Sequence, residues 1–280
     1  MVLSARTRRK AGKALSYALL ILFGCVFFSP LLWMLSTALK PQDQIFLNPP
    51  KWIPEPVKWE NFAAIFRRMP LARYTGNTLL LATLPVIGQT LAAPMIAYSL
   101  TKIPWKGPKF IFPFILATMM IPWQVTQIPL FITWSKLGLV NTFTPLVLPA
   151  FFGSSYNIYL MRQFIKALPD SVIEASRIDG ANEATILYRV VYPMCKPVIT
   201  TVMVLVFIGG WNDLNGPLLY LQSSERYTLS IGLQMFLTTA RQEWDLLMAA
   251  GALFTLPLIL IFFFAQKQFI SGISTTSGLK

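Results

Sequence analysis

The 280-residue sequence contains no histidine and only two cysteines, Cys25 and Cys195. Histidine is the commonest general base near neutral pH and a frequent metal ligand, and two cysteines so far apart do not make a zinc site. The sequence also lacks a Gly-x-x-x-x-Gly-Lys-Ser/Thr loop for nucleotide phosphates. We therefore expect no metal site, no bound cofactor and no enzyme activity, and any nucleotide that drives this protein must be bound by another chain.

Charge is also scarce. Charged residues make up 12% of the chain, and the mean hydropathy is +0.56. About 20 apolar residues are needed to cross the roughly 30 Å of a bilayer core. Of the six charge-free segments given below, the fifth, Pro197–Asn212, reaches that length only if it continues past Asp213 to about Tyr220. We therefore predict an all-α membrane protein with six transmembrane helices. The charge-free segments are Ala14–Leu39, Tyr74–Thr101, Phe110–Ser135, Leu137–Met161, Pro197–Asn212 and Leu246–Gln266.

The basic residues indicate how these spans are oriented. With the N-terminus in the cytosol, fifteen of the 24 Lys and Arg residues lie on the cytosolic side, although the loop after the first span carries six that oppose the bias. Short cytosolic loops are enriched in Lys and Arg, so we predict that both termini are cytosolic. Topology and attraction to anionic lipid explain the net charge of +13 without a nucleic-acid partner.

This topology divides the chain into segments. The external loop is rich in Pro and Trp, and its prolines favour extended, irregular backbone. A second external loop, 222–245, has room for a short amphipathic helix around Ile231–Leu237. The predicted segments are a basic cytosolic tail (1–13), the first transmembrane helix (14–39), the external loop (40–73), a core of five transmembrane helices (74–266) with a cytosolic insert (166–197), and a cytosolic tail (267–280).

The cytosolic insert is polar and rich in signals for helix ends. Ser171 followed by Glu174 fits a capping box, which predicts a helix start. Gly180 is suited to closing that helix, Asn182 to capping a second one, and Pro193 to stopping it. We predict a helix, a glycine turn and a second helix.

The insert resembles the "EAA" loop of ATP-binding-cassette (ABC) importer permeases. The resemblance rests on Glu174-Ala-Ser-Arg-Ile-Asp-Gly-Ala181, Val190-Val-Tyr-Pro193 and Pro197. Ser176 stands where the family has a second Ala, and Tyr192 where it has Leu. Both departures leave the helix-turn-helix pattern intact.

Motifs along nearly the whole chain are similar to the second permease of carbohydrate importers of the maltose (MalG-like) type. The resemblance implies a type I ABC importer permease fold in a bacterial or archaeal cytoplasmic (inner) membrane. It also implies a heterodimer with a homologous permease, two ATPase subunits that hold ATP and Mg, and an extracytoplasmic solute-binding protein. The motifs are Glu60-Asn-Phe62, Tyr159–Phe164, Ala167–Asp170, Gly210-Trp-Asn-Asp213, Tyr227-Thr-Leu229 and Gly272–Lys280.

The resemblance also assigns roles to residues. The EAA helices of the family sit in a groove on the ATPase, and in maltose-type relatives the last residues reach the ATPase interface. Glu174 has two readings, since it either pairs with a basic group on the ATPase or only completes the capping box. The residues implied in ATPase coupling are Glu174, Ala175, Ser176, Asp179, Gly180, Ala181 and Pro193, with Ser277, Gly278, Leu279 and Lys280 at the C-terminus.

Polar and aromatic residues in or near the spans are candidates for a sugar path, because sugars need hydrogen-bond partners and aromatic faces. For each of them, an interhelical hydrogen bond or an interfacial anchor is the alternative. In the maltose importer the other permease holds the sugar, so direct contact with the substrate stays open here. The candidates are Gln124, Gln127, Asn157, Trp211, Asn212 and Asp213.

Two alternatives to a carbohydrate importer remain. One is an importer of the same type for glycerol phosphate. The other is an ion-coupled secondary transporter, which would have a polar midplane but no need of a capped cytosolic helix pair.

Overall fold

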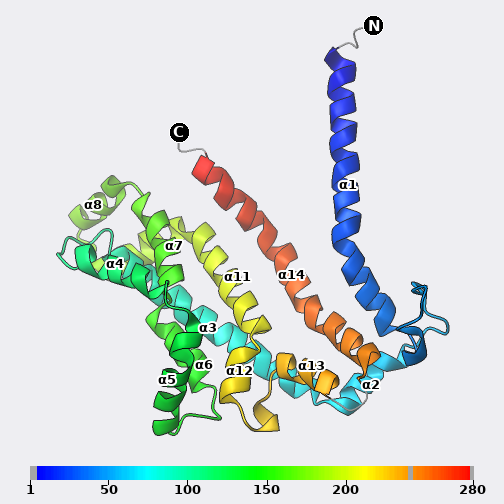
Figure 1. Ribbon diagram of the computed structural model, residues 1–280. Coiled ribbons are helices and arrows are strands. Elements are labelled where there is room, and N and C mark those ends of the chain that lie inside the picture. Colours follow the sequence, from blue (N-terminus) through cyan, green and yellow to red (C-terminus); the bar gives the residue numbers. More distant parts are fainter. Residues whose placement is uncertain (1–4, 239–241, 278–280) are drawn as a thin grey trace. The chain divides into compact units, whose positions relative to one another are not determined.

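The computed structural model describes residues 5–238 and 242–277, and every regular element in them is a helix (Figure 1). The chain forms two compact units. One contains the residues up to Met69 together with Leu233–Leu256, and the other contains Pro70–Gly232 and the residues from Pro257 onward. The helix α13 (Leu229–Thr238) supplies the amphipathic helix expected around Ile231–Leu237, and α14 (Trp244–Ser277) is the last helix.

The first unit contains α1 (Ala5–Ala38), the short turn η1 (Gln42–Gln44) and α2 (Glu60–Arg68). The last carbonyls of α1 lack helical partners, and the Asn61 side-chain amide of α2 donates to the carbonyls of Ala38 (2.9 Å) and Lys40 (3.0 Å). In the predicted external loop 40–73, the described part up to Pro56, where the prolines favour irregular backbone, has η1 as its one regular element. The second half of this loop is helical, and Asn61 and Ile65, one turn apart, are both buried.

The second unit is organised around α3 (Leu71–Ser99), which packs along α11 and against α6, η2 and α7 (Figure 1). Its helices follow one another closely and are mostly short. In chain order after α3 they are α4 (Pro108–Thr118), α5 (Trp123–Lys136), α6 (Thr144–Val147), η2 (Leu148–Phe152), α7 (Ser155–Lys166), α8 (Asp170–Ile178), α9 (Glu183–Ile186), the π-helical turn η3 (Leu187–Val191), α10 (Tyr192–Met194), α11 (Lys196–Asn212), α12 (Asn215–Tyr220) and η4 (Ser224–Arg226).

Within residues 5–238 and 242–277, three helical segments are long and apolar enough to cross a membrane alone: Gly12–Ala38, Leu71–Ser99 and Trp244–Phe264. Two further candidates are bent pairs. The helices α4 and α5 meet at a bend of 97°, and Glu183–Met194 meets α11 at a bend of 82°.

The predicted span over residues 137–161 is not a continuous helix. It is divided into α6, η2 and α7. Pro149 cannot donate a backbone hydrogen bond, and Gly153 has a φ of +79°, which a right-handed helix does not accommodate. The absence of charges therefore identified an apolar segment here, but it did not predict that the helix would be interrupted.

Glycine allows α11 to approach α3 closely. A Cβ atom on Gly210 would lie 2.9 Å from Ala82 Cα and 3.0 Å from the Leu81 carbonyl oxygen. Such contacts are shorter than packed atoms tolerate, so this crossing has no room for a side chain. Small residues serve the same purpose at helix crossings in membranes generally.

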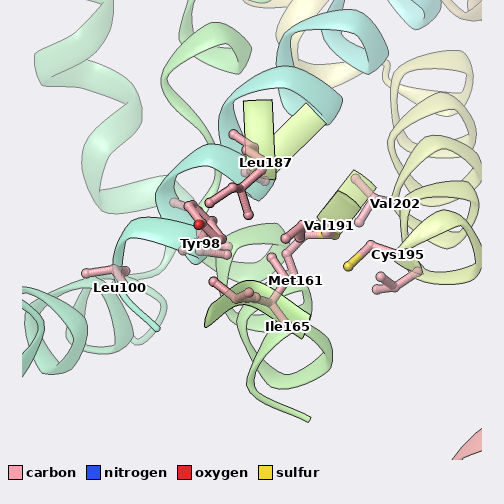
Figure 2. Close-up of a cluster of buried hydrophobic side chains, with 14 residues drawn as sticks. Tyr98, Leu100, Met161, Ile165, Leu187, Val191, Cys195 and Val202 are labelled. Atoms are coloured by element: carbon pink, nitrogen blue, oxygen red, sulfur yellow. The ribbon is translucent and has the colours of Figure 1, made fainter. Parts of the chain in front are cut away.

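An apolar cluster joins α3 to the insert 166–197. Figure 2 shows side chains of α3, α7 and the helices after Gly180 converging on it. Ile173 of α8 belongs to the same cluster and is only 3% exposed. The buried cluster members are Ala93, Ala97, Tyr98, Leu100, Ile158, Met161, Ile165, Ile173, Ile186, Leu187, Val191, Cys195, Val198 and Val202.

We predict that Gly210→Ala lowers the stability of the α3–α11 packing by about 1–3 kcal/mol, the usual cost of overpacking. Gly209→Ala is the matched control, because a Cβ on Gly209 meets nothing within 4 Å. Both substitutions raise helix propensity by the same amount. A difference in stability between the two variants therefore reports the close contact at Gly210. The measurement is the apparent melting temperature of each purified variant, and equal values would contradict the packing argument.

Candidate functional site

The first helix of the insert 166–197, α8, begins at Asp170, and Pro169 is its N-cap residue. No side chain caps this end, so the predicted capping box of Ser171 and Glu174 is wrong. Pro169 takes the N-cap position two residues before Ser171, which places Ser171 inside the first turn. The Glu174 carboxylate is exposed and forms no hydrogen bond within the described part of the chain.

The end of α8 is as predicted. Gly180 has a φ of +83°, and two backbone bonds close the turn: Gly180 N–H donates to Arg177 O (3.0 Å) and Ala181 N–H to Ser176 O (3.0 Å). This is the Schellman arrangement, which favours glycine at this position. The Asn182 side chain then caps α9 by accepting from Thr185 N–H at 2.8 Å.

The second helix of the insert passes through Pro193 instead of stopping there. It runs as α9, η3 and α10 to Met194, and the chain bends at Cys195 before α11. Pro193 lies in the first turn of α10, directly after the π-helical turn. A proline is tolerated there because its missing N–H is one that a first turn leaves unpaired.

The two sides of α8 differ. Ile173 points into the apolar cluster, whereas the opposite side is exposed and includes Ile178, which is 85% exposed. The exposed residues at helical spacing are Ser171, Glu174, Ala175 and Ile178, which we call the α8 outer face.

Hydrogen bonds tie α8 and α9 to α3. Arg177 Nε donates to Glu183 Oε1 at 2.8 Å, and the Tyr98 hydroxyl of α3 donates to Glu183 Oε2 at 2.5 Å. Arg177 Nη2 also donates to the Lys102 carbonyl (2.8 Å) just beyond α3. Bonding to Glu183 raises the pKa of the Arg177 guanidinium further above its already high ordinary value.

A second ion pair fixes the start of α8. Lys102 Nζ donates to Asp170 Oδ1 at 2.6 Å and to the Leu168 carbonyl at 2.7 Å. The lysine side chain is 6% exposed and the aspartate side chain 76%. Both ends of α8 are thus anchored to the chain that follows α3. This anchor is formed by Tyr98, Lys102, Arg177 and Glu183. None of these residues was predicted in this role, because nothing in the sequence pairs residues 85 positions apart, as Tyr98 and Glu183 are.

The two departures from the EAA pattern are accommodated. The Ser176 hydroxyl donates to the Val172 carbonyl one turn earlier (2.8 Å), so it needs no other partner. The Tyr192 hydroxyl donates to the Thr90 carbonyl of α3. Pro94 has no N–H to donate to that carbonyl, so Tyr192 satisfies a backbone group that a leucine would leave unpaired.

A hollow of about 400 Å³ lies at the other end of α11, between α5 and α12. Asp213 follows α11 and caps the first turn of α12, since its Oδ1 accepts from Gly216 N–H at 3.1 Å. Asp213 also borders a second hollow of about 200 Å³. The lining of the first hollow is Trp123, Thr126, Gln127, Leu130, Asp213, Asn215, Gly216, Leu219 and Tyr220.

The structure brings together two of the six candidate path residues, Gln127 and Asp213. Asn157 is buried and donates to the Gln89 side chain of α3 at 3.1 Å, an interhelical bond. Trp211 is also buried, stacked on Phe207 with ring centroids 5.7 Å apart. Gln124 and Asn212 are exposed and do not line this hollow.

The C-terminal candidates are only partly described. The helix α14 ends at Ser277, so the predicted tail 267–280 begins as helix. Gly278, Leu279 and Lys280 lie outside the described residues.

Residues 89–275 match the model of the family described as binding-protein-dependent transport system inner membrane component. The chain is 32% identical over 279 residues to the arabinooligosaccharides transport system permease protein AraQ of Halalkalibacterium halodurans, covering 98% of this chain and 99% of the relative. It is 29% identical over 261 residues to the diacetylchitobiose uptake system permease protein DasC of Streptomyces coelicolor, covering 92% of this chain and 93% of DasC.

A solved structure has the same fold. It is the crystal structure of a bacterial ABC transporter involved in the import of the acidic polysaccharide alginate. One of its chains superposes with a TM-score of 0.81 at 22% identity, over 96% of this chain and all of the other.

We predict that Gly180→Val weakens ATP-driven uptake and speeds amide exchange in α8, because a β-branched residue disfavours positive φ by about 1–2 kcal/mol. A side chain here would meet nothing within 4 Å, so the backbone alone decides the effect. Gly180→Asn is the control, since asparagine tolerates this conformation, and it should retain most of the uptake. Equal behaviour of the two variants would refute the glycine requirement.

We predict that Tyr98→Phe speeds amide exchange in α8 and α9 about tenfold, which corresponds to roughly 1.4 kcal/mol for a lost hydrogen bond to a carboxylate. Solute transported per ATP hydrolysed should fall as well, because the insert is less firmly held. Tyr188→Phe is the control: Tyr188 is on the same insert, is 45% exposed, and donates only to Met95 Sδ at 3.4 Å. The anchor has no role in coupling if both variants transport the same amount of solute per ATP.

Proposed function

The chain belongs to the family of binding-protein-dependent transport system inner membrane components, and we propose that it is one of two permease subunits of an ABC importer for an oligosaccharide. It is a permease and does not itself hydrolyse ATP. The carbohydrate cargo is supported by the full-length similarity to permeases named for arabinooligosaccharides and diacetylchitobiose. Glycerol phosphate is the alternative cargo.

The observation that carries the coupling role is the α8 outer face. Ile178 is 85% exposed beside the unpaired Glu174 carboxylate, while Ile173 and Arg177 hold the opposite side of the helix in place. A preorganised helix with an apolar residue and a free acid suits a groove with an apolar pocket and a basic rim. We assign the outer face to contact with an ATPase subunit, with one ATPase under each permease and ATP and Mg bound there.

The remaining assignments follow from the same assembly. A second, homologous permease completes the path, and an extracytoplasmic solute-binding protein delivers the cargo. The chain crosses the membrane six times, with 137–161 as a broken crossing and both termini in the cytosol. Residues from Ser277 to Lys280 reach toward the ATPase interface.

Reconstitution tests the proposal. The chain alone in proteoliposomes should move no sugar, and adding the second permease, the ATPase and the binding protein should give uptake that requires ATP. Uptake is measured with sodium and proton gradients collapsed. If the chain alone transports solute along an ion gradient, it is a secondary transporter and the importer assignment is wrong.

One variant in the same assay tests the outer face. Ile178→Asp should abolish most ATPase association, because it places a charge in the apolar centre of the contact. Val172→Asp is the control, since Val172 is on the same helix, 36% exposed, but off the outer face. Equal loss in both variants would mean that α8 does not dock through this face.

A further inference from the structure

The hollow beside Asp213 is far from the coupling face. The 17 residues of α11 separate the two regions, a rise of about 25 Å at 1.5 Å per residue. The predicted topology places the insert in the cytosol, so the hollow lies toward the external side. Its volume of about 400 Å³ falls within the roughly 300–1,000 Å³ of small-molecule sites.

The aromatic residues of the hollow suit a sugar ring. Trp123 of α5 lines the hollow and is about half exposed. Tyr220 of α12 also lines it and is 7% exposed. The Tyr220 ring is fixed by stacking on Phe131, with centroids 6.2 Å apart and planes 26° from parallel. A rigid ring and an accessible one offer apolar faces to the C–H side of a sugar.

The polar residues are available to a ligand. The side-chain amides of Gln127 and Asn215 line the hollow and form no hydrogen bond within the part of the chain that the structure describes. Asp213 Oδ1 accepts from Gly216 N–H, which leaves further acceptor sites on the carboxylate. Amides both donate and accept, and a carboxylate accepts strongly from hydroxyl groups.

The described lining of the hollow carries one negative charge and no positive charge to balance it. Among the nine described residues that form it, Asp213 is the only charged one, and it takes part in none of the ion pairs of the described residues. A uronate placed here would bring a second negative charge against an uncompensated first one. A neutral sugar would instead donate its hydroxyl protons to Asp213.

We propose that this hollow is a subsite for one unit of a neutral oligosaccharide, with Trp123 and Tyr220 stacking on the sugar and Asp213 excluding acidic sugars. The proposal rests on the carbohydrate importer function above and adds to it a binding site on this chain and a charge selection. The other half of the path belongs to the partner permease.

Protection of an engineered cysteine tests the subsite. In the Cys25→Ser background, Thr126→Cys reports from the lining, and Thr133→Cys is the matched control on the same helix but outside the lining. Both threonine hydroxyls bond only to backbone of their own helix, so the exchanges are comparable. Cys195 is buried and remains.

The complex of both permeases and the ATPase is labelled in lipid with a water-soluble maleimide, without the binding protein, which would select sugars itself. Arabinotriose or diacetylchitobiose should slow labelling of the Thr126→Cys variant at least about fivefold, trigalacturonate less than about 1.5-fold, and neither should change labelling of the Thr133→Cys variant. Asp213→Asn keeps an acceptor for Gly216 N–H. When it is combined with Thr126→Cys, trigalacturonate should protect the introduced thiol nearly as well as the neutral sugars do.

The outcomes separate the two proposals. Equal protection by acidic and neutral sugars with Asp213 intact overturns the charge selection. No protection of the Thr126→Cys thiol by any sugar, in a complex that still takes up carbohydrate with ATP and binding protein, overturns the subsite and leaves the importer function standing. A complete complex that takes up no carbohydrate with ATP overturns the importer function itself.

Discussion

The orientation of α8 depends on one buried contact region between the insert 166–197 and α3. A helix of nine residues is too short to be stable alone, so its neighbours must fix it. Ile173 anchors it in the apolar cluster, and Arg177 reaches Tyr98 of α3 through Glu183. Burial of apolar side chains provides most of the stability of this contact region. The directional hydrogen bonds set the angle at which α8 presents its outer face.

Local rules in the sequence predicted much of the insert and less of its surroundings. The glycine turn at Gly180 and the cap at Asn182 follow from backbone geometry within a few residues, and both are present. The capping box failed because the N-cap is Pro169, two residues before Ser171. The anchor to Tyr98 was not predictable, since its partners become neighbours only after α3 and the insert have packed together.

The spans show the same division between composition and backbone detail. Apolar length predicted six spans, and the described residues contain three unbroken candidates and two bent pairs; it did not predict the bends at Pro122 and Cys195 or the break at Gly153. Breaks and prolines in an apolar medium leave backbone groups that need partners. Here other helices of the chain supply them: the Tyr192 hydroxyl donates to the Thr90 carbonyl, which Pro94 cannot pair, and the Gln89 side chain accepts from Ser154 N–H, next to Gly153, at 2.9 Å. These partners come from distant parts of the chain, which a single sequence does not reveal.

Two elements link the insert to the hollow beside Asp213. The helix α11 does so through the chain itself, running from Lys196 after the insert to Asn212 before Asp213. The helix α3 does so by packing, because Tyr98 touches the insert while Leu81 lines the second hollow that Asp213 borders. The close crossing of the two helices at Gly210 lies at the Asp213 end, since Gly210 and Leu81 line the same hollow as Asp213. Since packed interiors deform little, this crossing fixes the position of the end of α11 against α3, beside Asp213.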